Sequence, residues 1–171
     1  MLIILFAGLS ACGTPQNHSP QRVSVEKLKE IVFSDTTHYK IVYLYNPLCG
    51  SCRSTLSEIL DTSKEKQSIQ CYALSIDSYR WYLPGIDIFG KGIKPFWISE
   101  ESSLLYKSDS DYVERILRVF IPDTTVSVFE GTPQTLIFYP NNELLKTHEE
   151  SFVVPADISF LKDNLNELQK H

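Results

Sequence analysis

The sequence lacks an excess of positive charge, a hydrophobic run long enough to cross a membrane, and a second pair of closely spaced cysteines. It carries 16 Lys and Arg against 21 Asp and Glu, a formal net charge of −5, which argues against a nucleic-acid partner. Only four cysteines occur in 171 residues, and a lone Cys-x-x-Cys motif is not the pattern of a disulfide-stapled scaffold. No internal repeat and no second domain is visible. Nine Tyr, nine Phe and two Trp instead indicate one packed globular domain.

The N-terminal end is apolar but short. The run Leu2–Ala7 is too short to span a bilayer as a helix and is typical of a secretory signal. It is followed by Leu-Ser-Ala-Cys, which resembles the lipobox of bacterial lipoproteins. The resemblance implies that residues 1–11 are a signal peptide and that the thiol of Cys12 is lipidated, for example with palmitate. With Gly13 rather than an acidic residue next, it also implies sorting to the outer membrane, facing the periplasm. The alternative is a hydrophobic segment with a chance cysteine.

The remaining chain divides into a short tether and one domain. Residues 12–22 comprise the lipidated cysteine and a polar stretch with two prolines, which is typical of a tether. Residues 23–171 are long enough to bury a sizeable core as a single domain.

Strand and helix patterns alternate in this domain. Apolar runs at 38–45 and 69–76 predict two buried strands, and the helical spacing between them predicts a helix from about Gly50 to Lys64. Two strands joined by a helix of this length form a βαβ unit, which implies parallel strands. We also expect helices at 24–33 (with Ser24 as N-cap), 109–120 and 157–168, a hairpin of 135–139 with 143–147 around Asn141-Asn142, and a short strand or buried loop at 96–98.

The Cys-x-x-Cys motif lies between the first strand and its helix, a context that indicates redox chemistry. Cys49 is expected at the N-terminal edge of the helix and Cys52 one turn in, so that both sulfurs lie on one face. Unpaired N–H groups and the helix dipole favour a thiolate at Cys49. Such cysteines have pKa values lowered from about 8.5 to roughly 3.5–7.5. We therefore expect Cys49 to be the nucleophile and Cys52 the resolving thiol.

The order of elements, with Gly131-Thr132-Pro133-Gln134 before a strand, resembles the thioredoxin fold, and within it the exported thioredoxin-like lipoproteins of Gram-negative bacteria. The resemblance implies an α/β fold with a central mixed β-sheet flanked by helices and an N-terminal helix. It also implies an insertion at 78–130 before a cis-proline loop. Thr132 and Pro133 would then lie opposite the cysteine pair and, with Gly50 and Ser51, form the substrate site. We predict a cis Thr132–Pro133 bond.

This resemblance implies a membrane-anchored thiol–disulfide oxidoreductase of the cell envelope. We expect a disulfide reductase, and a disulfide-forming oxidase is the alternative direction. Its expected partners are envelope proteins with disulfides or thiols, a membrane electron donor or acceptor, and the membrane itself through Cys12. We expect a monomer with no cofactor and no metal. Two departures stand out. Gly50-Ser51 replaces the Gly-Pro of cytosolic thioredoxins, and Tyr43 occupies the place of a buried acidic residue.

Two other functions stay open at this point. A non-catalytic thioredoxin-like interaction module fits the missing acid and the long insertion, whose aromatic residues suit either core packing or a docking surface. A Cu(I)-handling lipoprotein would use Cys49 and Cys52 with His148, since soft thiolates select Cu(I); a solvated histidine at a strand end is the alternative for His148. Cys71, in an apolar strand, is interpreted as a buried structural thiol.

Overall fold

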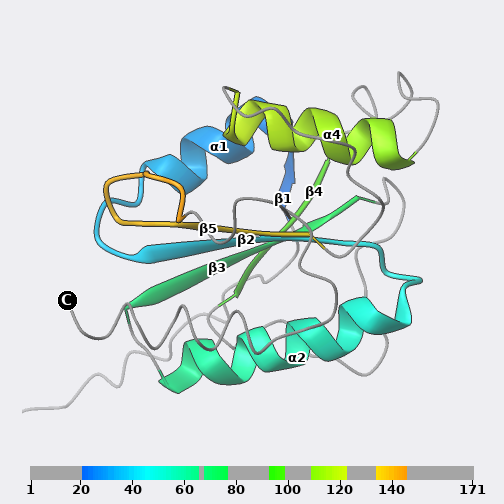
Figure 1. Ribbon diagram of the computed structural model, residues 1–171, viewed down its shortest axis with the longest axis horizontal. Helices are drawn as coiled ribbons and strands as arrows, with labels where there is room; N and C mark the ends of the chain where they lie inside the picture. Colours follow the sequence, from blue (N-terminus) through cyan, green and yellow to red (C-terminus); the bar gives the residue numbers. More distant parts are fainter. Residues whose placement is uncertain (1–20, 66–67, 77–92, 99–108, 123–133, 146–171) are drawn as a thin grey trace, which may run out of the picture.

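A five-stranded mixed β-sheet forms the centre of the computed structural model, which describes residues 21–65, 68–76, 93–98, 109–122 and 134–145 (Figure 1). The spatial order of the strands is β1-β4-β3-β2-β5. Neighbouring strands run parallel except for β5, which pairs antiparallel with β2. The strands are β1 (Gln21–Val23), β2 (Tyr39–Tyr45), β3 (Ile69–Ser75), β4 (Ile93–Ile98) and β5 (Gln134–Phe138).

Within the described residues, three helices cover the two faces of the sheet. Helices α1 (Val25–Phe33) and α4 (Asp109–Phe120) lie together on one face, and α2 (Gly50–Glu65) lies on the other (Figure 1). Ser24 caps α1, because its side-chain oxygen accepts a hydrogen bond from the Lys27 N–H at 3.2 Å. The predicted starts and ends of these helices agree with the structure to within a residue or two.

Strand β2 is apolar along nearly its whole length because helices cover both of its sides. Successive side chains of a strand point to opposite faces. Val42 and Leu44 therefore join the cluster under α1 and α4, whereas Ile41, Tyr43 and Tyr45 face α2. All five are fully buried. The predicted parallel βαβ unit is confirmed, with Tyr43 opposite Ala73 on β3.

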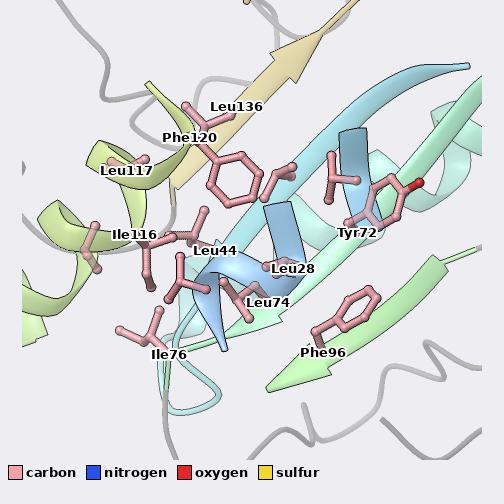
Figure 2. Close-up of a cluster of buried hydrophobic side chains, with 14 of the residues drawn as sticks. Leu28, Leu44, Tyr72, Leu74, Ile76, Phe96, Ile116, Leu117, Phe120 and Leu136 are labelled. Carbon is pink, nitrogen blue, oxygen red and sulfur yellow. The ribbon is translucent and has the colours of Figure 1, made fainter. Parts of the chain in front are cut away.

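The larger core cluster joins elements from all parts of the described chain. Figure 2 shows Leu28 of α1, Leu44 of β2 and Leu74 of β3 gathered with side chains of α4. Replacing one such buried leucine by Ala costs about 2–5 kcal/mol, which makes this cluster the main support of the α1–α4 layer. Phe96 of β4 is part of the same cluster, so for this aromatic the core-packing interpretation is confirmed.

A tight turn follows β5, as predicted from Asn141-Asn142. Asn142 has a positive φ of 70°, which asparagine tolerates better than most residues. The Tyr139 N–H donates to the Glu143 carbonyl at 2.9 Å, and Leu144 bridges back to Phe138. The hairpin partner is thus confirmed as far as Leu145.

One boundary predicted from the sequence needs correction. Gln21 and Arg22 were assigned to the tether, but they belong to β1 and pair with Phe96 and Trp97 of β4. This short strand, with two polar residues and one valine, forms by pairing with the edge of β4. The segment 78–130, which the sequence predicts as an insertion, supplies β4 to the sheet and α4 to one helix layer.

The order of strands and helices along the chain is that of the predicted thioredoxin-like fold. A parallel β2–α2–β3 unit has its Cys-x-x-Cys motif at the start of α2, and β5 lies antiparallel on the other side of β2. The α/β class and the mixed sheet flanked by helices are confirmed. Within the described ranges, no helix is long and apolar enough to cross a membrane. Predictions for the signal peptide, Cys12, His148, the cis Thr132–Pro133 bond and the helix at 157–168 lie outside the described residues.

Candidate functional site

A turn built around Asn46 carries the chain from β2 into α2. The Asn46 side-chain oxygen accepts a hydrogen bond from the Leu48 N–H at 2.9 Å, and its carbonyl accepts one from the Cys49 N–H at 3.0 Å. Asparagine side chains favour such turns by replacing a backbone acceptor. The result places Cys49 directly before the first helical residue, Gly50.

The sulfur of Cys49 lies 3.0 Å from the Ser51 hydroxyl and accepts a hydrogen bond from the Cys52 N–H at 3.3 Å. Burial raises the pKa of this thiol, but the hydrogen bonds from Cys52 and Ser51 outweigh burial and leave the pKa below its usual value. When Cys49 is ionised, the Ser51 hydroxyl is the donor. Cys49 is half-buried, so its sulfur combines access with a stabilised thiolate.

Cys52 lies one turn further along α2 and is fully buried in the cluster between α2 and the sheet. Cys49 is therefore the more exposed of the two cysteines. The contrast arises from the helix itself, because its first turn leaves Cys49 at the tip and turns Cys52 toward β2.

Tyr43 of β2 lies beneath Cys52. Its hydroxyl donates a hydrogen bond to the Cys52 carbonyl at 2.8 Å. Burial raises the pKa of the phenol far above its ordinary range, and the nearby Cys52 sulfur raises it further. Tyr43 thus stays neutral and is not a proton-accepting base, unlike the acidic residue whose place it takes.

Two further residues beside the cysteines, Asn46 and Thr55, were not predicted from the sequence. The Asn46 turn follows a strand and is a recognisable Asx pattern, so a signal for it was present. Thr55 looks like an ordinary polar residue of an amphipathic helix, yet it is only 5% exposed and its hydroxyl makes no hydrogen bond of good geometry. Nothing in its sequence context marks it.

Cys71 does not join the pair at the helix start. It lies on β3 opposite Ile41 and is fully buried, and burial raises the pKa of its thiol to about 12. These properties agree with the interpretation as a structural thiol.

Of the four residues predicted to form the substrate site, the structure describes Gly50 and Ser51. Ser51 is exposed beside Cys49, and a Cβ built on Gly50 would meet no atom within 4 Å, so the rim of the site is open at this position. Thr132 and Pro133 lie outside the described residues. Among the described residues, no group of three or more His, Cys, Asp or Glu side chains is arranged to hold a metal ion.

No family model and no curated protein matches the sequence. Several solved structures are similar. Thioredoxin f2 of Chlamydomonas reinhardtii is 10% identical with a TM-score of 0.49, over 90% of this chain and 99% of that chain. The thioredoxin domain of a Bacteroides vulgatus thiol-disulfide oxidoreductase is 14% identical with a TM-score of 0.48, over 80% and 81%. Arabidopsis thaliana ScoI with copper bound is 13% identical with a TM-score of 0.49, over 84% and 89%.

Proposed function

We propose that the protein is a thiol–disulfide oxidoreductase in which Cys49 is the nucleophile and Cys52 the resolving thiol. The observation that carries this proposal is the environment of the Cys49 sulfur. It lies 3.0 Å from the Ser51 hydroxyl and accepts a hydrogen bond from the Cys52 N–H at 3.3 Å, beside a buried second thiol. The thiolate is the reactive form in disulfide exchange, and its fraction at neutral pH rises when the pKa falls.

The reaction has two exchange steps. The Cys49 thiolate attacks one sulfur of a substrate disulfide, forming a mixed disulfide and releasing the other substrate sulfur as a thiolate that takes up a proton. Cys52 then loses its proton and attacks the Cys49 sulfur. The bond between Cys49 and the substrate breaks, its electron pair leaves with the substrate sulfur, and a Cys49–Cys52 disulfide remains. Substrate is reduced by two electrons and the protein is oxidised by two.

We propose that the protein works as a reductase, so a membrane electron donor must return the pair to its dithiol form. Its substrates are proteins of the cell envelope with accessible disulfides. Thr132 and Pro133, with Gly50 and Ser51, are proposed to contact the substrate backbone next to the disulfide, and no cofactor or metal takes part.

Two cysteine variants test the chemistry in an insulin-reduction assay. Cys49→Ser should abolish activity because the attacking sulfur is gone. Cys52→Ser should leave the first step intact and accumulate mixed disulfides on Cys49, which peptide mapping detects. If the unaltered protein does not reduce insulin and Cys52→Ser traps no mixed disulfide, the chain is a non-catalytic interaction module instead.

We also propose that Cys12 anchors the protein by lipid to the outer membrane, facing the periplasm. The support is the Leu-Ser-Ala-Cys sequence at residues 9–12 with Gly13 after it. Mass spectrometry of the membrane-extracted protein should find a lipid-modified N-terminal Cys12. An intact Met1 or an unmodified Cys12 would contradict the anchor without affecting the redox proposal.

A further inference from the structure

Side chains that carry hydroxyl groups, from β2 and α2, lie in the region of Cys52 between the helix and the sheet. Tyr43 and Tyr45 stack at a ring-centroid distance of 6.1 Å with an interplanar angle of 10°. The Tyr43 hydroxyl reaches the Cys52 carbonyl, whereas the Tyr45 hydroxyl interacts with Ser75 of β3. Thr55 stands one turn after Cys52 on α2, on the same helix face.

The Thr55 hydroxyl is buried and makes no hydrogen bond of good geometry, although it lies close enough to the Tyr43 phenol to lower the pKa of that group. A buried hydroxyl without a partner costs free energy of folding, which a valine of the same shape would avoid. Such a group in a native structure needs a reason, and a catalytic role is one that recurs. In the second exchange step Cys52 must become a thiolate in a buried position, and hydrogen-bond donors stabilise a buried thiolate. A free hydroxyl close to Cys52 would therefore assist this step.

We propose that Tyr43 and Thr55 are positioning residues for the resolving thiol, an inference that rests on the proposed oxidoreductase function. The Tyr43 hydroxyl fixes the backbone of the first turn of α2 through the Cys52 carbonyl. The Thr55 hydroxyl donates a hydrogen bond to the Cys52 sulfur when that sulfur loses its proton. Both act without charge, so they assist the second exchange step and leave the first step, at Cys49, unaffected.

The two steps separate in a single-turnover reaction of the reduced protein with Ellman's reagent. Attack by Cys49 releases one thionitrobenzoate at a rate proportional to reagent concentration. Attack by Cys52 on the Cys49 mixed disulfide then releases the second thionitrobenzoate at a rate independent of that concentration, and the Cys49–Cys52 disulfide forms. Tyr43→Phe and Thr55→Val remove one hydroxyl each at nearly constant shape. Tyr45→Phe is the matched control on the same strand.

The expected result is an unchanged first phase in all three variants and a second phase slowed about fivefold in Tyr43→Phe and Thr55→Val, the change that one net hydrogen bond produces. Tyr45→Phe should leave both phases unchanged. Thr55→Val should also melt at the same temperature as the unaltered protein or higher, because it removes an unsatisfied hydroxyl. Slower resolution with equal or greater stability is a combination that a merely structural role does not produce.

Second-phase rates equal to those of the unaltered protein in both variants would overturn the inference. So would an equal slowing of both phases together with lower stability, which indicates a general packing role. Because Thr55→Val is expected to fold well, it keeps the test decisive even if Tyr43→Phe folds poorly. Absence of any second phase in the unaltered protein would instead refute the oxidoreductase proposal itself.

Discussion

Lys40 is a fully buried lysine whose ammonium group ties three segments of the domain together. Its Nζ donates to the Asp35 carbonyl at 2.8 Å, to the Pro140 carbonyl at 2.9 Å and to the Asn142 side-chain oxygen at 2.6 Å. Burial lowers the pKa of Lys40, and the nearby Asp35 charge works in the opposite direction. The three bonds therefore offset the cost of burying the charge and hold the turn after β5 against the loop after α1.

We expect Lys40→Met, which keeps the length of the side chain, to lower the free energy of unfolding by about 3 kcal/mol. The figure assigns about 1 kcal/mol to each of the three hydrogen bonds lost. For a domain of this size, it corresponds to a fall in melting temperature of roughly 6–12 °C. Urea denaturation monitored by circular dichroism measures the change directly, and the slope of the transition should not change.

Two other lysines give a graded control. Lys29 makes one bond, to the Val119 carbonyl at 2.6 Å, so Lys29→Met should cost about 1 kcal/mol. Lys27 pairs with Glu30 where both side chains are more than 60% exposed, and Lys27→Met should cost about 0–0.5 kcal/mol. If Lys40→Met costs no more than Lys29→Met, the three bonds of Lys40 do not stabilise the fold and the reasoning is wrong.

Three further predictions address the ionisable groups. Burial raises the pKa of Asp35, but hydrogen bonds from His38 and Thr37 outweigh burial and hold the pKa below its usual range. Asp35→Asn should therefore destabilise the fold most above pH 4, and the loss of stability should become smaller as the pH falls below 4. Urea titrations at several pH values measure this loss. Ser51→Ala removes a hydrogen bond to the Cys49 sulfur, so the pH profile for iodoacetamide labelling of Cys49 should have its midpoint at a higher pH. An unchanged midpoint would exclude a role for Ser51 in stabilising the Cys49 thiolate. Cys71 should stay unlabelled in the native protein at pH 8 and react only on unfolding, because its pKa is raised to about 12 and it is fully buried; native labelling of Cys71 would contradict its place in the core.

Much of this architecture could be predicted because local patterns coincide with the tertiary environment. The run ending at Tyr45 is apolar because helices cover both faces of β2, and the stripe on 109–120 faces one side of the sheet. Cys49 and Cys52 follow from motif and context alone. Each of these features is contained in a short stretch of sequence.

The parts that could not be predicted depend on contacts between distant segments. The acceptors of Lys40 include residues 100 and 102 positions away, so nothing near Lys40 in the sequence marks it as buried. Strand β1 exists only through pairing with β4, and the polar residues Gln21 and Arg22 give no sign of it. Thr55 differs from other helix-surface hydroxyls only because Tyr43 and the sheet cover it.

The central claim is that Cys49 and Cys52 form a reversible dithiol–disulfide couple. Equilibration of the purified protein in glutathione buffers of graded potential, followed by acid quenching, alkylation and peptide mass analysis, tests it most directly. We predict one two-electron transition in which a Cys49–Cys52 disulfide forms while Cys71 remains a thiol. A midpoint near −270 mV would support the reductase direction, and one near −120 mV would indicate an oxidase. If no Cys49–Cys52 disulfide forms at any glutathione ratio, the claim is wrong.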